Sequence, residues 1–267
     1  MLNQLSQSHL TLLEACPRRF QHAYLDQLMH PMTREQQAAL EWGNRFHVMM
    51  QQRELGLPLQ AIDTPAESDD AALLPTVQQF VQTNPDLFAV QPGIGRYSEH
   101  RRTCNVQGYL LTAVYDLLIA RETTAEILDW KTYPKPKDLR WLAQNWQTRL
   151  YPFILAETTN YAPDQISLTY WFVRAETQEG TPQPQSLTFP YSAAQHEATR
   201  EAIAQLLNQL TQWLHDYEAG IPFPQVPEEE GLCPNCSFGT RCQRNIQPSR
   251  SSIDLIPDVA AIEEVSL

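Results

Sequence analysis

The chain has 267 residues, a hydrophobic content of 42% and a formal net charge of −12 at pH 7. This length is typical of one large domain, or of a domain with a small appendage, and the hydrophobic content excludes a wholly disordered chain. The first ten residues carry no basic or apolar leader, and no apolar run reaches membrane-spanning length. We therefore expect a soluble, cytoplasmic protein with no membrane partner.

Helical spacing of apolar residues dominates the beginning of the chain. Residues 8–28 are predicted to form a helix that is bent or divided at Pro17. A second helix is predicted for residues 33–55, where Thr33 and Gln36 have the spacing of a capping box. The following segments are expected to be a loop at 56–70, a short helix on the rim at 71–84 and a loop at 85–95.

The periodicity then changes from helical to alternating. Three consecutive antiparallel strands are predicted at residues 97–106, 109–119 and 125–130. They are followed by a long helix at 138–157, strands at 165–175 and 185–190, and an amphipathic helix at 192–219. This order of elements indicates an α/β or α+β domain built around a sheet.

Two of the predicted strands carry charged residues that belong together. Alternate side chains of a strand point to opposite faces, so Asp129 and Lys131 share one open face, and Leu128 and Trp130 lie on an apolar one. If the hairpin is symmetric about residues 122 and 123, Asp116 lies directly opposite Asp129. Two carboxylates at that separation can share Mg²⁺ or Mn²⁺, which activates a water for attack on a phosphodiester. A solvated strand edge also carries such triplets, so a structural role stays open.

Positive charge is concentrated in the same part of the chain. All three lysines lie within seven residues, at positions 131, 135 and 137, and Arg140 and Arg149 follow them. Taken whole, the charge of −12 disfavours a nucleic-acid partner, but this segment could contact phosphate locally.

Asp116 followed by Asp129-Trp130-Lys131 resembles the PD-(D/E)XK phosphodiesterase signature, in its RecB-like branch. In that branch, a helix with a Gln-x-x-x-Tyr motif follows the D-x-K strand, and Gln147 and Tyr151 occupy this place. They are four residues apart and therefore share a helix face. The resemblance implies a restriction-endonuclease-like fold, with a central mixed sheet flanked by helices.

The RecB-like branch also has an upstream helical histidine that can ligate the metal, and His47, four residues after Gly43, fits this position. The alternative for His47 is an ordinary structural histidine. The resemblance implies that His47, Asp116 and Asp129 hold the metal, and that Lys131 positions the nucleophile. Gln147 and Tyr151 would orient the substrate or support the site.

Three further positions bear on this resemblance. Glu99 is similar to an additional acidic position of the family. Two departures concern geometry: Ala113 stands where relatives usually have Gly, and Pro152 is expected to kink the helix directly after Tyr151.

Four of the five cysteines suggest a soft metal centre. Cys233, Cys236 and Cys242 form a C-x2-C-x5-C group near the end of the chain, and Cys16 is the candidate fourth ligand. Zinc and a [4Fe–4S] cluster both accept four thiolates. The arrangement, including Cys-Pro-Arg-Arg-Phe at Cys16, resembles the iron–sulfur staple of AddB-type and CRISPR-associated RecB-like nucleases, which implies a cluster and leaves zinc as the second alternative. Cys104 has no partner at suitable spacing and is predicted to be a structural strand residue.

Together these patterns predict a metal-dependent DNA nuclease that acts on single strands or duplex ends, with an iron–sulfur cluster that joins the two ends of the chain. Residues 1–245 would form one nuclease domain in which 61–95 is an acidic insertion, and 246–267 would be a disordered tail. The alternatives are a non-catalytic DNA-binding subunit of a repair or CRISPR-type complex, working with a helicase or another protein, and a zinc-stabilised interaction module.

Overall fold

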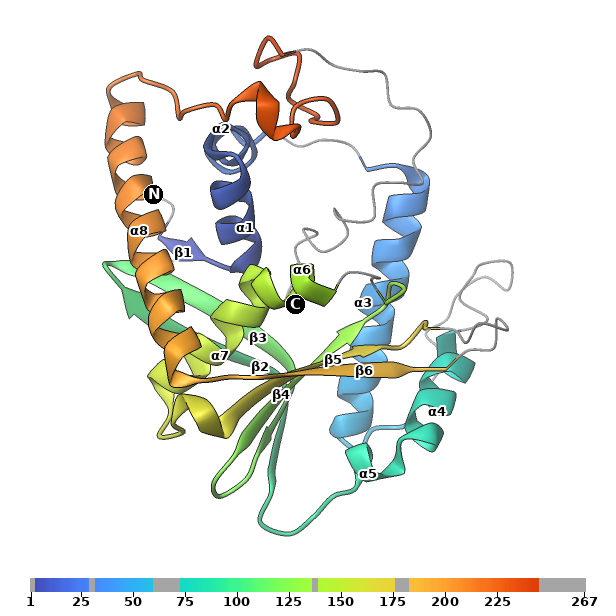
Figure 1. The fold of residues 1–267 in the computed structure, drawn as a ribbon. Helices are drawn as coiled ribbons and strands as arrows, with labels where there is room; N and C mark the ends of the chain where they lie inside the picture. Colours follow the sequence, from blue (N-terminus) through green and yellow to red (C-terminus); the bar gives the residue numbers. More distant parts are fainter. Residues whose placement is uncertain (1–2, 29–31, 60–72, 136–138, 176–182, 245–267) are drawn as a thin grey trace.

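A six-stranded mixed sheet forms the centre of the molecule, and helices cover both of its faces (Figure 1). The structure is a computed structural model that describes residues 3–28, 32–59, 73–135, 139–175 and 183–244. The strands are β1 (Gln4–Leu5), β2 (Gly95–Val106), β3 (Tyr109–Ala120), β4 (Ala125–Lys131), β5 (Ile166–Phe172) and β6 (Gln185–Pro190).

The helices fall into an N-terminal group, a middle pair and a C-terminal group. They are α1 (Gln7–Ala15), α2 (Pro17–Phe20), the π-helical turn η1 (Gln21–Leu25), α3 (Arg34–Glu54), α4 (Leu73–Thr83), α5 (Pro85–Phe88), α6 (Leu139–Gln144), α7 (Trp146–Thr158) and α8 (Ala193–Glu218), with short 3₁₀ turns η3 (Pro163–Gln165) and η4 (Glu228–Glu230). None of the helices in the described ranges is both long and apolar enough to cross a membrane.

The sheet combines antiparallel hairpins with parallel pairs. Its strand order is β1-β3-β4-β5-β6, and β2 pairs with β3. β2–β3, β3–β4 and β5–β6 are antiparallel, whereas β1–β3 and β4–β5 are parallel. Strands β4 and β5 can be parallel because α6 and α7 lie between them in sequence and provide the crossover that a parallel pair requires.

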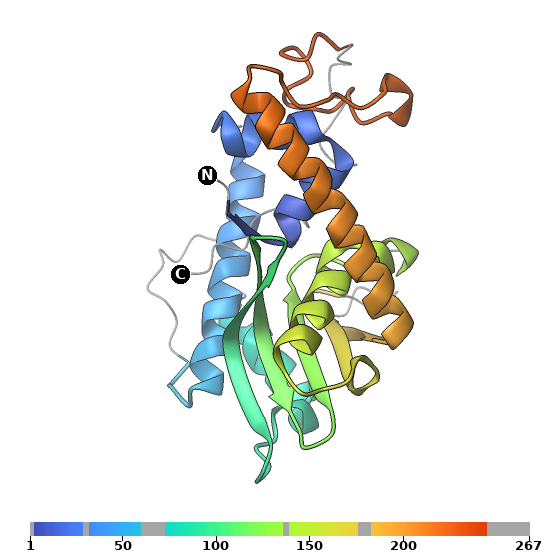
Figure 2. The same ribbon diagram turned by 90° about the vertical axis from the view of Figure 1, so that its left-hand side faces the viewer.

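Each face of the sheet has its own hydrophobic cluster. One cluster joins the sheet to α1, α7 and α8, and the other joins it to α3, α4 and α5. Figure 2, turned from Figure 1, shows α3 on one side of the sheet and α8 on the other. Strand β4 contributes to both clusters, because Ile127 packs with the α7 side and Leu128 with the α3 side.

Most of the predicted elements are present, including the division of the first helix at Pro17, and two helices differ from the prediction. The helix predicted for residues 8–28 is divided before Pro17 and continues as α2 and a π-helical turn. The helix predicted for 138–157 is divided at Asn145, whose side chain caps the new start of α7 by accepting from the backbone N–H of Gln147. The helix predicted on the rim is α4, and its Val77 and Phe80 are fully buried in the α3-side cluster.

Several short elements were not predicted, among them β1, α5 and the two 3₁₀ turns. The strand β1 pairs with the start of β3, and α5 lies inside the segment expected to be a loop. Most of the loop predicted at 56–70 and all of the tail 246–267 lie outside the described residues.

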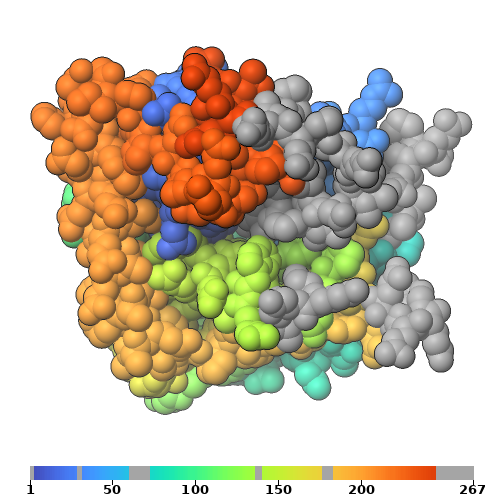
Figure 3. Space-filling view, turned by 45° about the horizontal axis from the view of Figure 1, so that its top comes forward, coloured from blue at the N-terminus to red at the C-terminus, as the bar shows by residue number. Residues whose placement is uncertain are grey.

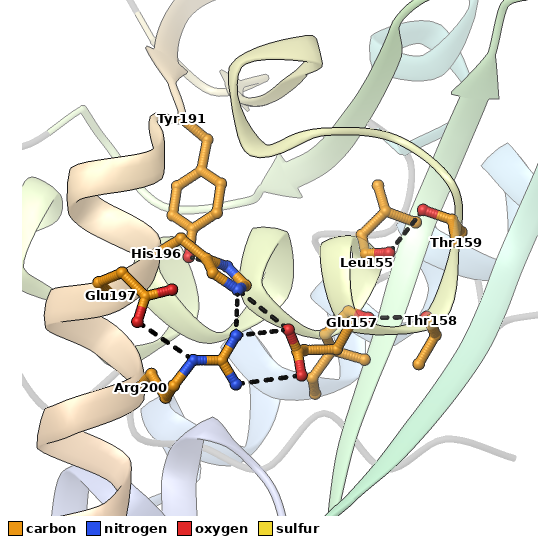
Figure 4. A network of polar contacts seen from close by, with 9 residues as sticks. Leu155, Glu157, Thr158, Thr159, Tyr191, His196, Glu197 and Arg200 are labelled. Atoms are coloured by element: carbon orange, nitrogen blue, oxygen red, sulfur yellow. Dashed lines mark hydrogen bonds and ion pairs between the residues drawn. The ribbon is translucent and has the colours of Figure 1, made fainter.

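A polar cluster holds α8 against the end of α7 (Figure 4). The Arg200 guanidinium donates to both carboxylate oxygens of Glu157, at 2.8 and 3.3 Å. His196 lies 3.0 Å from the same carboxylate and stacks on Phe153, with ring centroids 4.9 Å apart. These contacts fix the long C-terminal helix on the α7 side of the sheet.

Candidate active site

The candidate site lies where strands β3 and β4 separate. Their backbone pairing runs from Ala120↔Ala125 to Leu117↔Leu128 and follows the register predicted from the hairpin. At the next position Asp116 does not continue the ladder. Its Oδ2 accepts a hydrogen bond from the backbone N–H of Trp130, at 2.6 Å, in place of a strand partner. The carboxylate of Asp116 therefore lies in the fork between the two strands. Asp116 is buried, with only 3% of its surface exposed.

On the α7 side of this fork, three side chains bind one another. The Lys131 Nζ lies 2.7 Å from Asp129 Oδ2 and donates to Gln147 Oε1 at 2.7 Å. Gln147 Nε2 donates in turn to Asp129 Oδ1. All three residues are buried, so the face that was expected to be open is covered by the first turn of α7. The buried ion pair has low exposure to water and keeps both groups in fixed positions.

On the α3 side, a second group of side chains meets the same fork. His47 Nδ1 lies 3.2 Å from Asp116 Oδ1. One donor atom from each of His47, Glu99 and Asp116 lies within 4.8 Å of the others. Strand β2 supplies Glu99, whose backbone adopts φ = 48° in the left-handed region, and the ladder between β2 and β3 skips this residue. An imidazole and two carboxylates form a donor set suited to a divalent cation such as Mn²⁺ or Mg²⁺.

Glu99 is the electrostatically strained member of this group. Burial, together with the charges of Asp116 and Asp129, raises the pKa of the Glu99 carboxyl to about 7, and His47 partly offsets the shift. The nearby positive groups thus do not balance the negative charge of the carboxylates. A bound cation would supply the missing positive charge.

The metal ligands predicted from the sequence are only partly brought together. His47 and Asp116 are in the compact group, and Glu99, the weaker family match, stands in the third place. Asp129 lies beside the group, and its two oxygens face Lys131 and Gln147. The direct role of Asp129 as a metal ligand therefore stays a prediction.

Tyr151 lies one helical turn after Gln147 but deeper in the core. It is 2% exposed, its ring packs edge-on against Tyr115 at 5.4 Å, and its carbonyl accepts from the Tyr115 hydroxyl at 3.0 Å. This placement suits support of the site better than contact with a substrate. Pro152 follows inside α7, which continues to Thr158.

Sequence reasoning missed Tyr170, which lies beside Lys131. In the parallel pairing of β4 and β5, Tyr170 is the partner of Asp129, and its ring lies 5.0 Å from the Lys131 Nζ. The hydroxyl of Tyr170 is within 2.8 Å of Thr148 Oγ1. Only the register between β4 and β5 reveals this neighbour, because the two strands are far apart in sequence.

Gly43 brings α3 close to the end of β4. A Cβ at this position would lie 3.1 Å from the Oγ1 of Thr132, the residue directly after Lys131. This is tighter than ordinary van der Waals contact, so a Cβ here would require the Thr132 hydroxyl to shift by a few tenths of an ångström. His47, one turn later on α3, reaches Asp116.

The four cysteines predicted to bind one centre line a single cavity of about 70 Å³. Cys16 comes from the junction of α1 and α2, and Cys233, Cys236 and Cys242 come from the segment after α8. All four thiols are free and half-buried. Among the described residues, no three of these sulfurs lie within 4.8 Å of one another. Cys104, on β2, is separate from them, and burial raises the pKa of its thiol to about 11.

Other contacts also join the N-terminal helices to the segment after α8. Phe223 is 1% exposed, its N–H donates to Gln21 Oε1 at 2.8 Å, and its carbonyl accepts from Arg18 Nε at 2.6 Å. In the space-filling view, the red C-terminal segment lies beside the blue N-terminal helices (Figure 3). The cysteine cavity therefore lies in a larger contact between the N-terminal helices and the segment after α8, to which the hydrogen bonds of Phe223 also contribute.

A sequence model of the PD-(D/E)XK nuclease superfamily matches residues 4–243. Among solved structures, the chain is similar to a protein from Eubacterium rectale provisionally described as an exonuclease, with a TM-score of 0.56 and 13% identity over 95% of this chain and 92% of the other. An alkaline exonuclease from Laribacter hongkongensis matches with a TM-score of 0.36 and 11% identity, over 82% of this chain and 95% of the other. No curated protein gives a significant sequence match.

Proposed function

Since this chain belongs to the PD-(D/E)XK nuclease superfamily, we propose that it is a metal-dependent nuclease that hydrolyses DNA, acting as an exonuclease on single strands or duplex ends. The observation that carries the proposal is the strand fork, where Asp116 meets His47 and Glu99 on one side and the Lys131–Asp129–Gln147 group lies on the other. The structural likeness to a protein described as an exonuclease supports the choice of exonuclease action.

In this proposal, the residues on the two sides of the fork have separate tasks. A bound Mg²⁺ or Mn²⁺ would polarise the phosphodiester and lower the pKa of an attacking water. His47, Glu99 and Asp116 would hold the cation, with Asp129 as a further ligand. Lys131 supplies positive charge where negative charge develops on the phosphate in the transition state. Gln147 and Asp129 keep the Lys131 ammonium in place, and Tyr151, buried one helical turn later on α7, would support the site.

DNA digestion tests this proposal. Labelled linear single-stranded, linear duplex and closed circular DNA would be incubated with the protein and Mn²⁺. We expect loss of the linear substrates, survival of the circles, and no cleavage by Asp129→Asn. Glu197→Gln, which removes an exposed carboxylate on α8, is the matched control and should cleave normally. A folded wild-type protein that cleaves neither DNA nor RNA would favour the non-catalytic binding subunit.

We further propose that the cavity lined by Cys16, Cys233, Cys236 and Cys242 holds a [4Fe–4S] cluster that joins the ends of one domain, residues 1–245. Four free thiols around one cavity support a soft metal centre. The sequence arrangement favours the cluster, because a lone N-terminal cysteine with a C-x2-C-x5-C group resembles the iron–sulfur staple more than the paired C-x2-C groups of zinc sites.

Anaerobic purification tests the cluster. The absorption spectrum and the iron, sulfide and zinc contents would be measured for wild type and Cys236→Ser. We expect a brown wild-type protein with about four irons per chain and a variant that loses them. A colourless wild type with about one zinc per chain would replace the cluster with the zinc alternative.

A further inference from the structure

His22 lies against one of the four cysteines. Its Nε2 is 3.7 Å from Cys242 Sγ, within the range of a hydrogen bond to sulfur, although the two residues are 220 positions apart. The residue is 4% exposed, and its ring packs on Phe238 with centroids 5.2 Å apart. Of the described residues, those that line the cysteine cavity include Cys242 and Phe238 but not His22. His22 therefore contacts the cavity wall from behind.

The position of His22 depends on a local departure from α-helical geometry. Residues Gln21–Leu25 form a π-helical turn directly after α2. Such turns are rare and are often found at functional sites. The turn brings Asp26, four residues after His22, to 2.8 Å from the imidazole Nδ1. A side-chain partner on Nδ1 fixes the ring so that Nε2 faces the sulfur.

Asp26 is itself held by three donors. The Tyr217 hydroxyl, from α8, donates to Asp26 Oδ1 at 2.8 Å, and Gln21 Nε2 reaches the same carboxylate at 3.2 Å. Burial alone would raise the pKa of Asp26, but the hydrogen bonds from His22, Tyr217 and Gln21 lower it below its usual value. A chain of contacts thus runs from α8 through the Asp26 carboxylate and the His22 ring to Cys242.

We propose that His22 is a positioning residue of the cysteine site, with both ring nitrogens protonated: Nε2–H donates to the Cys242 thiolate, and Nδ1–H donates to Asp26. The inference rests on the proposed cluster and adds a residue that the cysteine pattern does not include. Partners of this kind orient metal ligands and tune their charge, and hydrogen bonds to sulfur influence both the hold on iron and the reduction potential of a cluster.

The proposal predicts the direction of two effects. An N–H donor stabilises negative charge on the thiolate, and the reduced cluster carries more negative charge than the oxidised one. Removing the donor should therefore lower the reduction potential. It should also speed the loss of iron, on the order of 10-fold, which is the low end of the effect seen when a partner of a metal ligand is removed.

The experiment uses the full chain, purified without oxygen, with three variants. His22→Leu removes the donor and keeps a side chain of similar bulk, whereas His22→Gln can place an amide N–H near the Nε2 position. His215→Leu, at an exposed histidine of α8, is the matched control. Iron release to a ferrous chelator, the reduction potential from spectroscopic titration, and far-UV circular dichroism as a fold check would be measured for each.

We expect His22→Leu to release iron about 10-fold faster than wild type and to have a cluster with a lower reduction potential. His22→Gln should recover part of both effects, and His215→Leu should match wild type. Unchanged release and potential in a folded, cluster-bearing His22→Leu would overturn the inference and leave the cluster standing. A folded His22→Leu that never acquires iron would also overturn it, because His22 would then be a ligand. A wild type without any cluster would overturn the cluster proposal itself, and the role of His22 with it.

Discussion

At the scale of single residues, Asp116 combines two tasks that have different chemical requirements. One carboxylate oxygen faces His47 and the candidate cation site, and the other accepts from the buried N–H of Trp130. The first task needs negative charge, whereas the second needs only an oxygen acceptor. Substitutions of Asp116 can therefore distinguish its contribution to cation binding from its contribution to the stability of the strand fork.

We predict that Asp116→Ala lowers the free energy of unfolding by about 1–3 kcal/mol, because it leaves the buried Trp130 N–H without an acceptor. Asp116→Asn keeps an acceptor oxygen and should cost clearly less. Both variants should lose Mn²⁺ binding. Chemical denaturation and calorimetric titration with Mn²⁺ measure the two properties. Equal destabilisation by the two variants would show that the carboxylate does not satisfy the backbone.

Glu99 should make cation binding depend on pH near neutrality. Its pKa in the folded protein is about 7, above the usual value of a carboxyl, because of burial and its acidic neighbours. Ionising it therefore costs stability as the pH rises from its unfolded pKa towards 7. Mn²⁺ competes with this proton, so the rise in Tm on adding Mn²⁺ should be larger at pH 8 than at pH 6. Glu99→Gln should show a smaller rise with little pH dependence, and the same dependence in the variant would assign it to another group.

At the scale of elements, the sequence predicts the strands better than the helix ends. Alternation and a short turn were sufficient to predict the register of β3 and β4, which the pairing Leu117↔Leu128 confirms. The short hairpin connection supplies this signal, because its length fixes which residues of the two strands face one another. The break of the helix at Asn145 was not predicted. It depends on a capping contact in a segment whose apolar spacing is continuous.

Part of the site could also be predicted from the alternation of side chains along the strands. Asp129 and Lys131 share a strand face by simple alternation, and Gln147 could be placed by its distance from them in sequence. The family resemblance indicated Glu99, but its contact with Asp116 could not be derived from strand alternation, because it depends on a left-handed backbone position and a skipped pair in the ladder. The contact of Tyr170 with Lys131 depends on the crossover between β4 and β5.

The close packing of α3 on the end of β4 leads to a prediction for Gly43. Gly43→Ala would place a Cβ 3.1 Å from Thr132 Oγ1 and push α3, with His47, away from Asp116. We expect weaker Mn²⁺ binding by calorimetric titration. Adding Thr132→Ala removes the conflicting oxygen and should restore binding, because the Thr132 Cβ is 4.0 Å away. Thr132→Ala alone is the control, and failure of the double variant to recover would argue against a steric cause.

The contact between α7 and α8 should have a small, pH-dependent effect on stability. The hydrogen bond from Arg200 lowers the pKa of Glu157 despite partial burial. The stabilisation is therefore present above the unfolded carboxyl pKa and is lost as the pH falls through the folded one. Since both side chains are partly exposed, we expect Glu157→Gln to cost at most about 1 kcal/mol at pH 7. Denaturation at low pH should show no difference, and Glu197→Gln should match wild type at both pH values.

At the scale of the whole molecule, the N-terminal helices meet the described segment after α8 on one side of the molecule, apart from the acidic fork (Figure 1). The cysteine pattern predicted this meeting, and the shared cavity and the contacts of Phe223 agree with it. The net charge of −12 is a poor guide to function in such a molecule. What matters for a phosphate-containing substrate is where the few cations lie, and Lys131 is held by Asp129 and Gln147 beside the candidate metal site.

The most direct test of the central claim is the single-turnover rate at which Lys131→Met cleaves labelled single-stranded DNA with Mn²⁺. Wild type should cleave, and the variant should be slower by at least about 100-fold, because the charge that stabilises the transition state is gone. Thermal unfolding and Mn²⁺ titration would establish that the variant is folded and still binds the cation. Cleavage by Lys131→Met at the wild-type rate would contradict the assignment of this fork as the catalytic site.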